Sequence, residues 1–141
     1  MEIKKVVVIG SGTMGSGIAA HLCNANIPVT LLDLKTEISQ QARDKIHKSK
    51  PPLLLDKSKI NNIKVGNISD DFAEVADADW VVEAVVERID VKHDIYGKIF
   101  KVRKNGAIVS SNTSSIPIKV LSQHLSEEEK KDFCIPTFLI P

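Results

Sequence analysis

The chain has 141 residues, of which 43% are hydrophobic and 26% are charged, and its formal net charge is +1. This length fits one domain with a buried core, and the balanced charge offers no basic surface for nucleic acid or for an anionic membrane. No apolar run approaches the roughly 20 residues that span a bilayer, and the chain enters a strand near its start, so we expect a cytoplasmic protein without nucleic-acid or membrane partners.

Apolar runs and helical patterns alternate along the chain, which is typical of a parallel sheet covered by helices. We expect strands near residues 4–9, 28–33, 62–66, 79–85 and 106–111, and helices near 13–25, 36–48, 70–76, 90–103 and 117–125. Between 49 and 62 the pattern is weak: two prolines end the second helix, and the apolar residues 53–55 form either a short helix at the sheet edge or a lid over the site. The predicted fold class is α/β, a Rossmann-type doubly wound, mostly parallel sheet with helices on both faces, and residues 1–141 form one domain.

The first predicted strand runs into a glycine-rich turn, GSGTMG, that opens the first helix. Gly10 permits a tight turn, Gly12 lets the backbone approach a pyrophosphate, and Gly15 lets the helix pack closely on the strand. The helix N-terminus offers free N–H groups and a positive dipole end to phosphates. Asp33, at the end of the second strand, is suited to accept hydrogen bonds from ribose hydroxyls and to repel a 2′-phosphate. A lone glycine turn is weak evidence, but this arrangement predicts binding of NAD rather than NADP.

Two further polar clusters follow strands of the predicted sheet. Glu83 and Glu87 lie around the end of the fourth strand, with Lys92 five residues after Glu87, and residues 111–115 read SNTSS after the fifth strand. Ligands of doubly wound sheets bind at the carboxyl ends of the strands, so both clusters are candidate sites. The residues alone equally allow a structural interpretation, because acids favour a helix start and small polar residues cap helices.

Cysteine and histidine give no sign of a metal site. Cys23 and Cys134 form no CxxC pair, and the four histidines lack ligand spacing. Two unpaired thiols fit a reducing compartment. We therefore expect no metal.

Three motifs in this order, GSGTMGSGIA, EAVVERIDVK and SSNTSSIPI, resemble the NAD-binding domain of the 3-hydroxyacyl-CoA dehydrogenases of fatty-acid β-oxidation. The stretch RDKIHKSKPPLLLDKSKI resembles the long members of that family, which carry further domains downstream. The resemblance covers essentially the whole chain and implies oxidation of an (S)-3-hydroxyacyl-CoA to the 3-oxoacyl-CoA, with hydride transfer to NAD. The serine-rich motif argues against other Rossmann dehydrogenases, such as the 6-phosphogluconate or UDP-sugar type, that share the glycine turn.

The resemblance implies a role for each matching position. The pyrophosphate would be cradled by the residues of the glycine turn, which are Gly10, Gly12, Thr13, Met14 and Gly15. Asp33 would hold the adenine ribose, and Glu87 and Lys92 would contact the cofactor. Ser114 would hydrogen-bond the reacting oxygen near the nicotinamide, and Asn112 would shape that loop beside the cofactor.

The last residues depart from the family pattern. The family's next strand carries a histidine, the general base for the hydroxyl proton, and here Thr137 stands in its place. A threonine hydroxyl is protonated near neutral pH and cannot serve as that base. If codons for Thr-His-Phe-Phe-Asn-Pro are read one nucleotide later, one codon choice gives the observed residues 136–141, so a frameshift after Ile135 is one hypothesis. Deliberate trimming of the chain is the alternative.

We therefore expect residues 1–141 to hold NAD(H) without the family's C-terminal helical domain, which carries the acyl-CoA cleft and most of the dimer interface. Alone, this polypeptide is expected to be inactive, and acyl-CoA would bind only if the helical domain were supplied in trans. The alternatives are a non-catalytic NAD-binding module or one half of a split enzyme.

Overall fold

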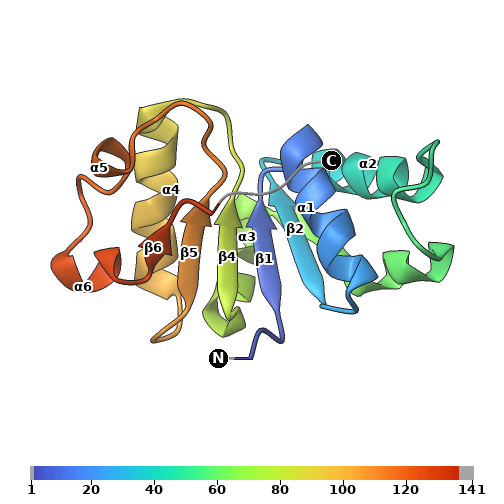
Figure 1. Cartoon of the computed structure of the whole chain (residues 1–141), viewed down its shortest axis with the longest axis horizontal. Coiled ribbons are helices and arrows are strands. Elements are labelled where there is room, and N and C mark those ends of the chain that lie inside the picture. The colour runs from blue at the N-terminus through green and yellow to red at the C-terminus, as the bar shows by residue number, and fades with distance from the viewer. Residues whose placement is uncertain (1, 137–141) are drawn as a thin grey trace.

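A computed structural model of the protein describes residues 2–136, so the predicted replacement of the base by Thr137 lies outside the described residues. Figure 1 shows the elements in chain order. With η denoting a 3-10 helix, they are β1 (Val6–Ile9), α1 (Thr13–Asn24), β2 (Val29–Asp33), α2 (Thr36–Lys48), η1 (Lys57–Asn62), β3 (Ile63–Asn67), α3 (Ile68–Asp71), η2 (Phe72–Asp77), β4 (Trp80–Glu83), α4 (Ile89–Val102), β5 (Ile108–Ser111), α5 (Ile118–Leu121), α6 (Glu127–Lys130) and β6 (Phe133–Cys134).

The described strands form one six-stranded sheet in the order β3-β2-β1-β4-β5-β6, and every neighbouring pair is parallel. β1 lies at the centre, where Val6 is opposite Val29 of β2 on one side and Trp80 of β4 on the other. The crossover from β3 to β4 reverses the direction in which the sheet grows, and ligands of such sheets bind where this reversal occurs. The strand arrows in Figure 1 point the same way, so the carboxyl ends meet at one edge. The predicted doubly wound α/β fold is confirmed.

Helices cover both faces of the sheet, and successive side chains of β1 point into a different core on each face. Val6 and Val8 belong to a core with residues of α1, α2 and η1, whereas Val7 and Ile9 belong to a core with residues of η2, α4 and α5. All four side chains are fully buried. Burial of each such side chain stabilises the fold by ~1.5–3 kcal/mol, and a strand buried on both faces reads as a continuous apolar run.

Several segments differ from the sequence prediction. The helix expected over 70–76 is split into α3 and η2, and the helix expected over 117–125 is reduced to the single turn of α5. α6 was not predicted, although Ser126 and Glu129 form a complete capping box that the sequence displays. In the weak segment, η1 follows the apolar residues, and Leu54 and Ile60 are buried in the α1–α2 core. Residues 53–55 themselves form no helix, and Leu53 and Leu55 are exposed, so the short helix predicted for these residues is not formed and only Leu54 packs into the core.

None of the described helices is both long enough and apolar enough to cross a membrane.

Candidate functional site

The glycine turn joins β1 to α1, and two of its glycines are required by the protein's own packing. Gly10 has φ = +103°, and a Cβ there would lie 2.3 Å from the carbonyl oxygen of Ala84. A Cβ on Gly15 would lie 1.9 Å from the carbonyl oxygen of Gly10. Neither position accepts a larger residue without displacing backbone, so the turn and the start of β4's following loop are held in close contact.

Gly12 is different, because a Cβ at this position would meet no described atom within 4 Å. It is the N-cap of α1, and among the described residues no side chain caps it and no acid lies in the first turn. The first turn of this 12-residue helix therefore carries no acidic side chain, and Thr13 and Met14 beside the N-cap are exposed. Open space at Gly12 together with this helix end suits a phosphate or pyrophosphate.

Asp33 ends β2 beside the glycine turn and is tied to it. Its Oδ2 accepts hydrogen bonds from the Ser11 backbone N–H at 2.8 Å and from the Ser11 hydroxyl at 2.5 Å, and its Oδ1 accepts from the Leu34 N–H at 2.7 Å. The carboxylate is half-buried and oriented before any ligand arrives. It carries a negative charge at the position where the sequence predicts the adenine ribose.

A fully buried carboxylate, Glu83, ends β4. It accepts hydrogen bonds from four donors, which are the Lys92 ammonium (2.6 Å), the Tyr96 hydroxyl (2.5 Å), the Ser111 hydroxyl (2.6 Å) and the Val85 N–H (2.9 Å). The Lys92 side chain is only 1% exposed, so its ammonium lies beneath the surface of the site. Burial and the neighbouring Glu83 carboxylate raise the pKa of Tyr96, which stays a hydrogen-bond donor.

Glu87 holds the loop that follows β5. Its Oε2 accepts from the backbone N–H groups of Ser114 at 2.9 Å and Ser115 at 3.1 Å, and Thr113 donates its hydroxyl to Oε1 at 2.9 Å. The Lys92 ammonium lies 3.3 Å from Oε1. Burial raises the pKa of Glu87, but its hydrogen-bond donors have the larger, opposite effect, and the net result is a pKa lowered to about 2. These donors are the Ser114 N–H, the Thr113 and Ser115 hydroxyls and the Lys92 ammonium.

The predicted site residues lie in two groups at the same edge of the sheet. The glycine turn and Asp33 lie at the ends of β1 and β2, whereas Glu87, Asn112 and Ser114 follow β4 and β5. The Ala84 N–H donates to the Ile9 carbonyl at 2.7 Å, which joins the two groups across the β1–β4 pair. The Asn112 N–H donates to the Glu83 carbonyl at 2.8 Å, so Asn112 shapes the loop through its backbone.

Sequence reasoning overlooked Ser11 and Tyr96, and it placed Ser111 in a candidate cluster without assigning it a partner. Ser11 was assigned no role, because the direction of its side chain depends on the turn geometry. Tyr96 lies four residues after Lys92 on α4, so both side chains face the same way, and this spacing was the available signal. Ser111 ends β5 opposite Glu83, a register that only the sheet pairing reveals.

This fold, with an open glycine turn, a free helix end and an acid after β2, defines the dinucleotide-binding domain of an NAD-dependent dehydrogenase. Residues 5–141 match the family described as the NAD-binding domain of 3-hydroxyacyl-CoA dehydrogenase. The chain belongs to this family, and its cofactor is NAD.

Similar proteins agree with this assignment. A Rickettsia felis protein described as a putative fatty acid oxidation complex trifunctional enzyme is 43% identical over 147 residues, covering 99% of this chain and 20% of that protein. A probable 3-hydroxyacyl-CoA dehydrogenase of Deinococcus radiodurans is 40% identical over 148 residues, covering 100% of this chain and 43% of the relative. The crystal structure of Escherichia coli 3-hydroxybutyryl-CoA dehydrogenase has a TM-score of 0.79 at 29% identity, covering 92% of this chain and 29% of that one. The chain thus spans less than half the length of these relatives.

Proposed function

We propose that this chain is the cofactor-holding part of an enzyme that oxidises (S)-3-hydroxyacyl-CoA thioesters to 3-oxoacyl-CoA in fatty-acid β-oxidation. In this reaction, the substrate C3 loses hydride to NAD⁺ and its hydroxyl loses a proton. The names of the Rickettsia and Deinococcus relatives support the substrate class. The observation that carries the proposal is the serine-rich loop bound to Glu87, placed across the β1–β4 pair from the glycine turn.

The residues divide the work between the two groups at the sheet edge. Gly12 and the start of α1 bind the pyrophosphate, and Asp33 accepts hydrogen bonds from the adenine ribose. The Ser114 hydroxyl is exposed and donates only a 3.3 Å hydrogen bond to Glu87, so it is available to bind a substrate oxygen. NAD, when bound, supplies the hydride acceptor.

The hydroxyl proton needs a base, and the resemblance places Thr137 where the family has histidine. We therefore propose that a polypeptide of these 141 residues binds NADH without turning substrate over. Acyl-CoA would be bound only when a helical substrate domain is supplied in trans. A non-catalytic NAD-binding module and one half of a split enzyme are the alternatives. Both thiols are free, Cys23 buried and Cys134 exposed, which supports a cytoplasmic location.

Two measurements on the 141-residue chain test the proposal. Calorimetry with NADH is expected to show saturable binding, whereas acetoacetyl-CoA is expected to cause no oxidation of NADH. Absence of binding at millimolar NADH would contradict the cofactor-holding role. Substrate-dependent oxidation of NADH by this chain alone would contradict the proposed inactivity and would require a base other than the missing histidine.

A further inference from the structure

Glu83 is a charged group that the proposed reaction does not use, although it is fully buried at the carboxyl end of β4. An isolated carboxylate is costly to bury, and here its two oxygens are satisfied by donors from β5, from α4 and from the chain following β4. The sequence provides a sheet register that brings Ser111 opposite Glu83 and a helix that aims Lys92 and Tyr96 at it.

Two separate routes lead from this carboxylate to the serine-rich loop. In the first, Oε2 binds the Lys92 ammonium at 2.6 Å, and that ammonium lies 3.3 Å from Glu87, which holds the N–H groups of Ser114 and Ser115. In the second, Oε1 accepts from the Ser111 hydroxyl at 2.6 Å, and the oxygen of that hydroxyl accepts from the Thr113 N–H at 3.2 Å. Both routes end on residues 113–115.

Lys92 makes its polar contacts inside the protein. Besides the two carboxylates, its ammonium reaches the Val85 carbonyl at 3.4 Å, and the side chain is 1% exposed. A cation between two carboxylates fixes the position of the more exposed one, Glu87, whose side chain is 34% exposed. Lys92 therefore acts on the site through Glu87.

We propose that Glu83 is a positioning residue: through Lys92 and Ser111 it holds residues 113–115 in the shape that receives the nicotinamide half of NAD, without touching the cofactor. The inference rests on the proposed function. The glycine turn and Asp33, at the ends of β1 and β2, take the adenosine diphosphate half. An extended dinucleotide lying across the β1–β4 pair then reaches the loop after β5 with its other half.

The decisive variant is the double substitution Glu83→Gln with Lys92→Met. Lys92→Met alone leaves the buried Glu83 carboxylate without a cation, and Glu83→Gln alone leaves the buried ammonium with only the partly exposed Glu87. The double change removes both charges at nearly constant volume, and such replacements are often tolerated. The introduced amide oxygen still accepts from Tyr96 and Ser111. Glu87, however, loses its cation, so its hydrogen bonds to the Ser114 and Ser115 N–H groups are weakened.

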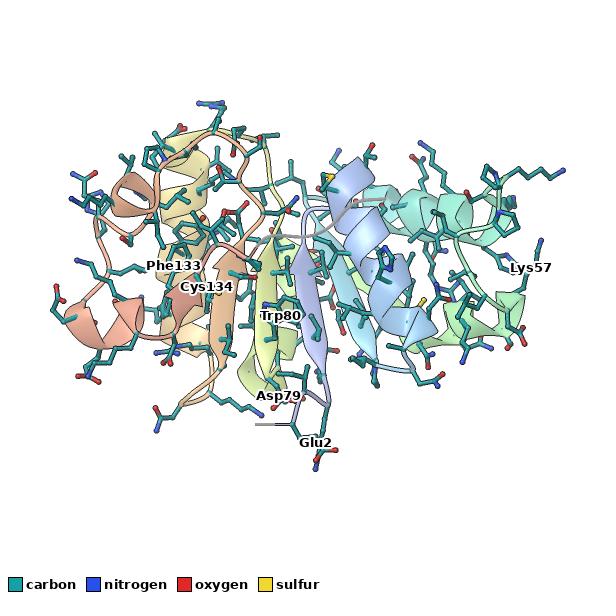
Figure 2. The ribbon with its side chains drawn as sticks, in the orientation of Figure 1. Glu2, Lys57, Asp79, Trp80, Phe133 and Cys134 are labelled. Atoms are coloured by element: carbon teal, nitrogen blue, oxygen red, sulfur yellow. The ribbon has the colours of Figure 1, made fainter. Side chains whose placement is uncertain are left out.

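Asp79→Asn is the matched control. Asp79, labelled in Figure 2, immediately precedes β4. Glu83 ends β4, so the control makes the same carboxylate-to-amide change at the opposite end of one strand. Asp79 accepts hydrogen bonds from the backbone of Lys4 and Lys5 and pairs with Lys104, so its loss affects stability without reaching the site.

The experiment measures dissociation constants for ADP and NADH and the hydrogen exchange of the Ser114 and Ser115 amides. The double variant is expected to bind NADH about tenfold more weakly, as for a weakened charge-assisted hydrogen bond, with ADP unchanged and faster exchange at both amides. Asp79→Asn is expected to change neither the affinity ratio nor these amides. Equal weakening of ADP and NADH, or no change in the ratio and in exchange, would overturn the inference.

Ser111→Ala keeps the test decisive if the double variant does not fold, because it interrupts only the second route and leaves the ion pair buried. It is expected to weaken NADH binding about threefold with ADP binding unchanged, because the loop loses the neutral hydrogen bond from the Thr113 N–H to the Ser111 oxygen. An unchanged NADH affinity in this variant would contradict the positioning of residues 113–115 by Glu83. Failure of the unaltered chain to bind both ADP and NADH would instead refute the cofactor-holding function and, with it, this inference.

Discussion

Ser11 holds Asp33 with two hydrogen bonds to one carboxylate oxygen, from its hydroxyl at 2.5 Å and from its backbone N–H at 2.8 Å. The acid after β2 and the glycine turn after β1 are therefore one rigid unit rather than two separate contacts. Its remaining oxygen is oriented by the Leu34 N–H. A carboxylate fixed in this way could bind the ribose that we propose for it without a further cost of ordering the side chain.

Asp33→Ala is expected to weaken NADH binding about tenfold or more, because a charged acceptor of ribose hydroxyls is removed. Binding of NADPH should weaken less, since the repulsion of a 2′-phosphate disappears at the same time. Calorimetry with both cofactors gives the two constants. Ser11→Ala serves as the comparison and should weaken NADH about fivefold, since Asp33 keeps its charge and loses one orienting bond. An equal loss for NADH and NADPH in Asp33→Ala would contradict the ribose role.

The three glycines of the turn are expected to respond differently to alanine. Gly15→Ala places a Cβ against the Gly10 carbonyl, and Gly10→Ala adds strain at φ = +103° to a contact with Ala84, so each should cost about 3 kcal/mol or more in the free energy of unfolding. Gly12→Ala should cost about 1 kcal/mol at most, because its Cβ meets open space and glycine is only a modest N-cap. Urea denaturation measures all three.

Gly12→Ala is also expected to lose most NADH affinity while remaining folded, because the added methyl group occupies the space assigned to the pyrophosphate. Retention of full affinity by this folded variant would show that the phosphates bind elsewhere.

Ser114→Ala is expected to leave NADH affinity within about twofold of the unaltered chain. The loop is held by the Ser114 backbone N–H, which alanine retains, and the serine hydroxyl contributes only a 3.3 Å contact. Fluorescence titration with NADH checks this. A large loss of affinity would mean that the hydroxyl binds the cofactor itself, and the proposed contact with a substrate oxygen would need revision.

Glu87 is expected to make stability depend on acid pH. Its pKa is lowered from 4.5 to about 2 in the folded chain, so its contribution is fully present above pH 4.5 and is lost as the pH falls toward about 2. The gap in unfolding free energy between the unaltered chain and Glu87→Gln should therefore narrow between pH 6 and pH 3. The pKa of Asp79 is also lowered, mainly by Lys104, but both proteins retain that group and its effect cancels. A difference in unfolding free energy that stays constant over this pH range would contradict the stabilising role of the ionised Glu87.

The central sheet, the glycine turn and the acid at Asp33 were predictable because they depend on local patterns: an apolar run, glycines at fixed offsets and a carboxylate after a strand. The burial of Lys92 was not predictable from the sequence, because its spacing of five residues from Glu87 does not reveal that its ammonium also binds the Glu83 carboxylate. Only the register of β4 with β5 and the direction of α4 bring these groups together.

The short elements near the C-terminal part were also poorly predicted. α5 ends after one turn at Ser122, whose hydroxyl donates to the Ile118 carbonyl at 2.7 Å. Such side-chain bonds to the backbone compete with continuation of the helix, so the sequence does not decide between one turn and a longer helix. β6 consists of Phe133 and Cys134, too short for an alternating pattern, and it exists through pairing with β5 (Figure 2).

The pairing of β1 with β4 joins strands from distant parts of the chain, as the match of Val6 with Trp80 shows. During synthesis, the unit of β1, β2 and β3 is complete before β4 emerges, and such a non-local pairing closes slowly. The proposed nucleotide site takes residues from both sides of this junction, so either half alone would offer only part of it. A bound dinucleotide that contacts both groups of strands would consequently hold them together, so it would lower the rate at which they separate as well as stabilise the folded state.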